Sequence, residues 1–117
     1  MIPADVFGFQ QLDVYRCAVR FVGLAAPLSE RMPRGYAALG DQLRRAALSV
    51  PLNIAEGNGL LQGNAAHHYS IARGSALECA AIFDACEAIG TASSAELASG
   101  RELLERVVAM LTKMTLR

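Results

Sequence analysis

The chain has 117 residues, of which 53% are apolar and only 6% aromatic. That length suits one domain around a single hydrophobic core, and we expect residues 1–117 to form it. Its eleven basic and eleven acidic residues balance, which excludes a protein drawn to nucleic acid or to an anionic membrane by overall charge. No apolar run reaches the ~18 residues of a membrane span, so we expect no membrane partner.

The cysteines indicate the compartment. Cys17, Cys79 and Cys86 are an odd number without a CxxC pair, and the chain starts without the basic and apolar regions of a secretory leader. We therefore expect a cytoplasmic protein in which these residues are buried free thiols, because cysteine packs as a small hydrophobic side chain.

Apolar residues recur at three- and four-residue spacing along most of the chain, which predicts amphipathic helices. The first helix is expected over residues 10–28, ended by Pro27 and by the Met-Pro-Arg-Gly segment at 32–35. The second begins near residue 36 and ends at Gly57 and Gly59, because glycine commonly follows the last helical turn.

Capping residues mark the other two helices. Asn64 is the expected N-cap of the third helix, which Gly90 closes. Ser93 or Ser94 caps the fourth helix, which has Glu96 in its first turn. Four helices joined by short connections predict an all-α fold, an antiparallel up-and-down four-helix bundle.

The second helix contains a proline. Pro51 lies within LRRAALSVPLNIAEGNGL at 43–60, where its ring clashes with the preceding turn and its nitrogen has no hydrogen to donate. The apolar stripe of this helix nevertheless stays in phase across Pro51, so we expect one continuous helix that is kinked at that residue. The stripe consists of Leu39, Leu43, Ala46, Val50 and Ile54.

A second, largely apolar face lies about 120° around the same helix. A helix in a four-helix monomer needs only one buried stripe, so the second face predicts a contact with another copy of the chain. The expected oligomer-interface residues are Leu48, Pro51, Leu52 and Ala55.

A polar stripe occupies the remaining face. Buried polar groups must find partners, so we interpret the stripe as a hydrogen-bonded network at a helix seam or subunit contact. A ligand or nucleic-acid surface and a plain solvated face are the alternatives. The expected network comprises Arg45, Ser49, Asn53, Glu56 and, on the third helix, Glu78.

Two residues of the third helix carry further expectations. Glu78 borders the predicted inner stripe, where an unpaired carboxylate would be costly, so we expect it to pair with Arg45 or Arg44. Gly74 costs the helix about 1 kcal/mol relative to alanine, which the close approach of another helix would explain.

Residues with catalytic or metal-binding chemistry are present but do not form a site. His67 and His68 are adjacent, so they do not share a helix face, and no further ligand stands at metal-binding spacing. Gly57, Gly59 and Gly63 lack the lysine of a phosphate-binding loop. The sequence therefore predicts no catalytic residue, no metal and no cofactor.

Arginine supplies nearly all of the positive charge, because Lys113 is the only lysine. Its planar guanidinium suits bidentate pairing with carboxylate or phosphate. Pairing with carboxylates of the chain is one interpretation, and contact with a nucleic-acid backbone is the other. The candidate nucleic-acid-binding residues are Arg16, Arg20, Arg44, Arg45 and Arg73.

Three segments carry a family resemblance: QLRRAALSVPLNIAEGNG at 42–59, IARGSALE at 71–78 and FQQLDVYRCA at 9–18. Together they closely resemble the small four-helix-bundle proteins encoded in intervening sequences of bacterial large-subunit ribosomal RNA genes. The same family includes the accessory variability determinant proteins of diversity-generating retroelements. On the matching positions, the family's recurrent polar residues fall at Arg44, Arg45, Ser49, Asn53, Glu56, Gly57, Gly74, Ser75 and Glu78.

The resemblance implies a four-helix bundle that assembles into a ring-shaped homopentamer, and retroelement members associate with nucleic acid and a reverse transcriptase. We expect a non-enzymatic homo-oligomer that serves as a nucleic-acid or ribonucleoprotein accessory factor. Its expected partners are its own copies and RNA, DNA or a nucleic-acid-processing protein. Retroelement members tend to be strongly basic, whereas this chain is neutral. The alternative is a protein-interaction scaffold oligomer without nucleic-acid binding.

Overall fold

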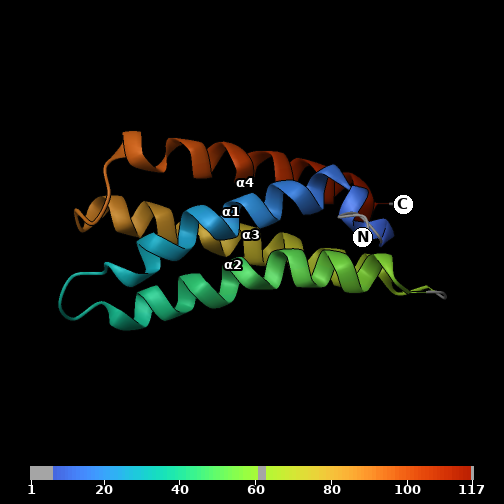
Figure 1. Ribbon diagram of the computed structural model, residues 1–117, viewed down its shortest axis with the longest axis horizontal. Coiled ribbons are helices and arrows are strands. Elements are labelled where there is room, and N and C mark those ends of the chain that lie inside the picture. The colour runs from blue at the N-terminus through green and yellow to red at the C-terminus, as the bar shows by residue number, and fades with distance from the viewer. Residues whose placement is uncertain (1–6, 61–62, 117) are drawn as a thin grey trace, which may run out of the picture.

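The computed structural model describes residues 7–60 and 63–116, and within them the chain is all-α, as predicted (Figure 1). A short 3-10 turn, η1 (Gly8–Gln11), precedes the α-helices. Those described are α1 (Asp13–Glu30), α2 (Ala37–Asn58), α3 (Ala65–Ala88) and α4 (Ser94–Thr115). In the described residues, no helix combines the length and hydropathy that crossing a membrane requires.

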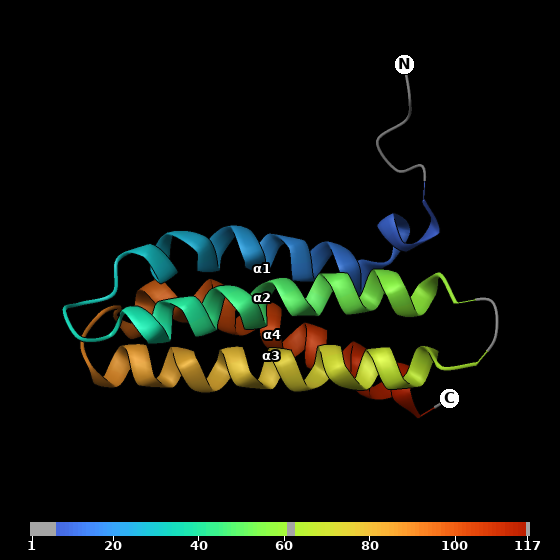
Figure 2. The same cartoon turned by 90° about the horizontal axis from the view of Figure 1, so that it is seen from below.

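The helices form a closed cycle in which each one packs against two neighbours. Helix α2 contacts α1 and α3, and α4 contacts α3 and α1. The α1–α2 and α3–α4 connections lie at one end of the bundle, and the α2–α3 connection lies at the other (Figures 1 and 2). The predicted antiparallel up-and-down bundle is confirmed. Its cyclic order places the α1/α4 seam on the opposite side of the molecule from the α2/α3 seam.

The start and end of α1 differ from the predicted bounds. Residues 8–11 form η1 instead of the first turn of the helix, with Gln10 N–H bonded to the Phe7 carbonyl at 3.1 Å. At the other end, Pro27 lies inside α1, which continues to Glu30. The prediction that Pro27 ends the helix was therefore wrong, because a helix can continue for its last turn after a proline near its end.

Helix α2 runs unbroken through Pro51, so its predicted continuity is confirmed. A kink at Pro51 stays a prediction. The predicted cap of α4 is also confirmed, because Ser93 Oγ accepts the Glu96 N–H at 3.2 Å and Glu96 Oε1 accepts the Ser93 N–H at 3.2 Å. Asn64 occupies the N-cap position of α3, although its side chain makes no capping hydrogen bond.

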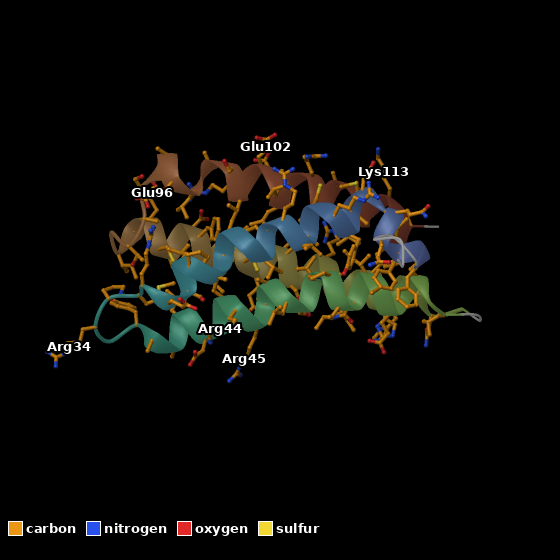
Figure 3. All side chains as sticks on the ribbon, viewed as in Figure 1. Arg34, Arg44, Arg45, Glu96, Glu102 and Lys113 are labelled. Atoms are coloured by element: carbon orange, nitrogen blue, oxygen red, sulfur yellow. The ribbon has the colours of Figure 1, made fainter. Side chains whose placement is uncertain are left out.

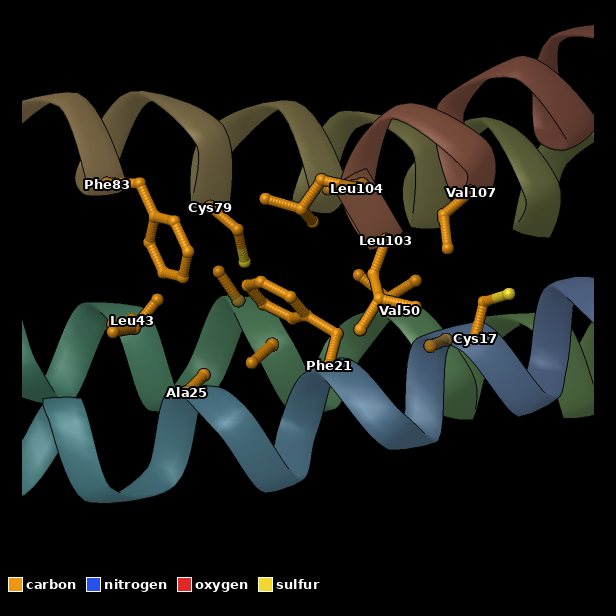
Figure 4. Close-up of a cluster of buried hydrophobic side chains, with 14 of the residues drawn as sticks. Cys17, Phe21, Ala25, Leu43, Val50, Cys79, Phe83, Leu103, Leu104 and Val107 are labelled. Carbon is orange, nitrogen blue, oxygen red and sulfur yellow. The ribbon is translucent and has the colours of Figure 1, made fainter. Parts of the chain in front are cut away.

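The core fills the space between the four helices (Figure 4). Its two largest fully buried side chains are Phe21 of α1 and Phe83 of α3, whose ring centroids are 5.3 Å apart. Gly100 of α4 leaves room for them, since an added Cβ would lie 2.6 Å from the Phe83 ring. Around these rings pack buried side chains of all four helices, including Cys17, Ala25, Leu43, Val50, Cys79, Leu103, Leu104 and Val107.

Candidate functional site

Three of the five candidate nucleic-acid-binding arginines, Arg44, Arg73 and Arg16, are engaged within the chain. Arg44 forms an exposed ion pair with Asp41 on α2, with 2.8 Å between nitrogen and oxygen. Arg73 Nε donates to Thr112 Oγ1 at 2.7 Å and so connects α3 to α4. Thr112 Oγ1 donates in turn to the Val108 carbonyl. An exposed pair adds little stability, but the guanidinium groups of Arg44 and Arg73 already have an intramolecular partner.

Arg16 and Arg20 lie one turn apart on α1, whereas Arg45 lies on α2. Arg16 Nε donates to the Gln10 carbonyl at 2.9 Å and holds η1 against α1. Arg20 lines the α1/α4 seam and Arg45 the α2/α3 seam, and neither makes a hydrogen bond or ion pair with a residue that the structure describes. In Figure 3 Arg45 points outward from α2, whereas Glu102 of α4 points outward on the opposite side. The five candidates therefore do not form one patch.

A groove of about 610 Å³ lies between α2 and α3. Across it, Gln42 Nε2 donates to Glu78 Oε2 at 2.9 Å. The expected pairing of Glu78 with Arg45 or Arg44 is wrong, because Arg44 binds Asp41 and the Glu78 side chain is exposed. A solvated carboxylate needs no buried cation. The polar lining of this groove comes from Asp41, Gln42, Arg45, Ser49, Ser75 and Glu78.

Beside this groove, half-buried side chains join α2 to α3 in what we call the Asn53 network. Asn53 Nδ2 donates to the carbonyl oxygen and to the hydroxyl of Ser49, at 2.9 and 3.1 Å. Ser75 Oγ donates to Ser49 Oγ at 2.8 Å. His68 Nδ1 lies 3.1 Å from Asn53 Oδ1 and 3.7 Å from Glu56 Oε2. Of the expected network, the structure brings these α2 residues together and leaves Arg45 and Glu78 outside.

The hydrogen bonds of the Asn53 network determine whether Nδ1 of His68 carries a proton. The Ser49 carbonyl can only accept, so Asn53 turns its NH₂ toward Ser49 and its Oδ1 toward His68. Because Oδ1 also only accepts, His68 Nδ1 must carry a proton. This geometry suits a structural role, in which hydrogen bonds hold α2 against α3. Sequence reasoning missed His68 and Ser75, and the sole signal for Ser75 was its place among the family's recurrent polar positions.

The predicted oligomer face of α2 is only partly exposed. Leu48 and Leu52 expose 42% and 64% of their surfaces, while Ala55 is half-buried. Pro51 is buried within its own chain. Pro51 therefore offers little surface to a second copy, since helical geometry puts it between the core stripe and Leu48, where intramolecular packing covers it. The interface itself stays a prediction.

A second groove, of about 450 Å³, lies between α1 and α4. Arg20 lines it from α1 and Arg106 lines it from α4. Arg106 was not among the sequence candidates, and like Arg20 it makes no hydrogen bond or ion pair with the described residues. No sequence signal could have related these two arginines, because they lie on helices at opposite ends of the chain.

The cysteines are buried, as predicted. Burial, and secondarily the charge of Glu78, raise the pKa of Cys79 to about 12. Burial likewise raises the pKa of Cys86. Such thiols stay protonated and inert at physiological pH, since the thiolate is the reactive form. Within ranges 7–60 and 63–116, no cluster of three or more His, Cys, Asp or Glu side chains could hold a metal ion.

Residues 10–113 match the profile of the family described as 23S rRNA-intervening sequence protein. The matched span starts just before α1 and reaches the last turn of α4. The chain belongs to this family. No curated protein matches it.

The residues that the family resemblance singled out have different roles in the bundle. Three of them, Ser49, Asn53 and Ser75, form the centre of the Asn53 network. Gly57 lets α3 approach α2, because an added Cβ would lie 2.9 Å from the Tyr69 ring. Gly74 is different. An added Cβ there would meet nothing within 4 Å, so close helix approach within the chain does not explain it.

Proposed function

We propose that this chain is a non-enzymatic, cytoplasmic homo-oligomer that serves as an accessory factor to nucleic acid or to a ribonucleoprotein. The family match is the main support for the proposal, because the description of the family refers to an intervening sequence of 23S rRNA. The four-helix bundle supplies a rigid body, and its exposed surface supplies the contacts. The protein acts by binding, in line with the buried, protonated thiols of Cys79 and Cys86.

Self-association is supported by the exposed leucines of α2. Leu48 and Leu52 stand on successive turns of one helix face, which favours burial against a second copy. The ring-shaped pentamer comes from the family resemblance alone. Light scattering after gel filtration tests both statements. A mass of 12.4 kDa, that of one chain, would refute the oligomer, whereas a dimer or tetramer would refute only the number five.

Nucleic-acid binding is supported by arginines that make no hydrogen bond or ion pair with a residue that the structure describes. Arg20 and Arg45 keep their guanidinium groups available for phosphate, and a ring repeats each of them around its axis. The net charge of zero predicts weak binding per subunit. Binding should therefore lack sequence specificity and should weaken steeply with salt, because phosphate contacts release counterions.

Fluorescence anisotropy tests this binding with labelled single-stranded and duplex nucleic acid at about 50 mM salt, where charges are weakly screened. We expect a signal that rises with protein and that added salt reverses. Non-specific nucleic-acid complexes have Kd values of about 10⁻⁴ to 10⁻⁶ M at physiological salt and bind more tightly at lower salt. Absence of binding at protein concentrations of about tens of micromolar would therefore reject the accessory role if light scattering shows an intact oligomer.

The second candidate is a protein-interaction scaffold oligomer that binds no nucleic acid. One observation favours it beyond the neutral charge: a groove of about 450 Å³ between α3 and α4 is largely apolar. Leu77 lies in it with 45% of its surface exposed, beside Leu104 and Val108. A negative anisotropy result with an intact oligomer would favour this candidate.

A further inference from the structure

The α1/α4 groove places two cations on facing walls. Arg20 stands on α1 and Arg106 on α4, both exposed. The groove also contains one carboxylate, Glu102, which forms no ion pair with either arginine. Three charged groups therefore leave an excess of one positive charge. Neither guanidinium is consumed by the described part of the chain, in contrast to Arg44.

The groove has an open apolar floor. Leu24 exposes 46% of its surface there. Gly23 stands beside it in the middle of α1, and an added Cβ would meet nothing within 4 Å. Glycine weakens a helix relative to alanine, and no neighbouring helix requires it at this position. A glycine at such a place allows a ligand to approach the backbone closely.

From this arrangement we propose that the α1/α4 groove is a nucleotide-binding site for a nucleic-acid strand. Arg20 and Arg106 hold a backbone phosphate from both walls, and Leu24 and Gly23 form the floor for the adjoining sugar and base. This inference rests on the proposed accessory function and names the site through which that function acts. The volume of about 450 Å³ lies in the range of small-molecule sites, about 300 to 1,000 Å³.

The chemistry favours phosphate over an acidic polypeptide. Guanidinium groups bind phosphate oxygens as bidentate forks, and their planes also stack on bases. An acidic helix laid along the seam would need a longer row of cations, yet this groove offers two arginines with Glu102 among them. One phosphate held between two guanidinium groups fits the charges that are present.

The test compares two double variants that each remove two positive charges. Arg20→Gln with Arg106→Gln removes the groove pair. Arg34→Gln with Lys113→Gln is the matched control, since both side chains are exposed, lie outside the groove and have no ion pair among the described residues. Anisotropy with a labelled single-stranded oligonucleotide measures Kd and its salt dependence for each protein.

We expect the double variant Arg20→Gln with Arg106→Gln to raise Kd about tenfold. Its plot of log K against log salt should be flatter, with a slope reduced by about 0.7 for each lost phosphate contact. The control pair should change Kd by much less. Gly23→Leu supplies a second test without a charge change. It should weaken binding by filling the floor, while circular dichroism shows an intact bundle with an unchanged or higher melting temperature.

Each other outcome overturns a defined part of the proposal. Equal losses of binding in the two double variants, or full binding by Gly23→Leu, would show that the strand is held by diffuse electrostatic attraction and not by the groove. Either result would leave the accessory function unchanged. Displacement of the oligonucleotide by polyglutamate as effectively as by unlabelled strand would assign the groove to an acidic polypeptide. No binding by the wild-type oligomer would reject both the groove and the accessory function.

Discussion

Single polar residues on the α2/α3 seam differ in what they contribute, and burial decides the difference. Asn53 is half-buried and uses its NH₂ and its oxygen within the network. Gln42 also reaches α3, through Glu78, but both partners are exposed. Removing one partner of a buried bond leaves the other without water to replace it, whereas water replaces an exposed partner.

We therefore predict that Asn53→Ala lowers the free energy of unfolding by about 1 to 3 kcal/mol, because the protonated Nδ1 of His68 loses its acceptor. Gln42→Ala is the matched control, and it should change stability by no more than about 0.5 kcal/mol. Urea denaturation followed by circular dichroism measures both. Similar effects of the two substitutions would show that the Asn53 network does not stabilise the packing of α2 against α3.

At the scale of the element, two helical glycines have opposite surroundings. Gly40 of α2 faces α1, and an added Cβ would overlap the carbonyl oxygen of Ser29. Because that oxygen belongs to the backbone, α1 and α2 would have to move apart. At Gly74 of α3, an added Cβ would meet nothing within 4 Å. The same substitution should therefore change stability in opposite directions.

Gly40→Ala is expected to destabilise by about 1 to 3 kcal/mol through overpacking, less the gain in helix propensity. Gly74→Ala should stabilise by about 0.5 to 1 kcal/mol, since it gains propensity without a clash. Thermal unfolding of the two variants measures the difference. A destabilising Gly74→Ala would contradict the open surroundings and would indicate close packing against another copy.

The N-terminus of α4 carries a pH-dependent contribution. The hydrogen bond from the Ser93 backbone N–H, followed by the Arg31 side chain, lowers the pKa of Glu96. Arg31 Nη2 lies 2.6 Å from Glu96 Oε2 and so connects the end of α1 to the start of α4. A carboxyl group with a lowered pKa in the folded state stabilises that state above its unfolded pKa. The contribution disappears as the pH falls through the folded pKa.

Glu96→Gln should therefore lower the melting temperature at neutral pH, and the difference from wild type should shrink as the pH falls through the lowered pKa. Differential scanning calorimetry over a series of acidic buffers measures this. A difference that stays constant across the series would show that the Glu96 charge does not stabilise α4.

For the whole molecule, the proposed self-association raises the question of which side would face another copy. The exposed leucines Leu48 and Leu52 of α2 mark one side, and Leu77 marks the α3/α4 groove. We predict that Leu48→Glu with Leu52→Glu dissociates the oligomer to the 12.4 kDa chain, because a charge buried at the contact lacks a partner.

Leu77→Glu is the control for this prediction, as it places the same charge on a leucine with similar exposure on another side of the bundle. Light scattering should give an unchanged oligomer mass for it, and circular dichroism should show folded protein for both. A double variant that keeps the full mass would move the contact away from the exposed face of α2.

The sequence by itself determined the helical character, the bundle and much of the core. Apolar spacing and capping depend on residues a few positions apart, so Ser93, the continuity through Pro51 and the buried cysteines could be read locally. The exceptions were also local. Pro27 lies inside α1, because the proline signal does not say how much helix can follow it.

Only the tertiary structure decided which polar residues meet. The partners of Asn53 and Arg73 depend on the rotation and axial register of neighbouring helices, which no spacing within one helix encodes. The same register separates Arg20 from Arg45 and brings Arg20 to Arg106. Helix faces follow from a period of 3.6 residues, whereas contacts between faces follow from packing, so the candidate site required the folded molecule.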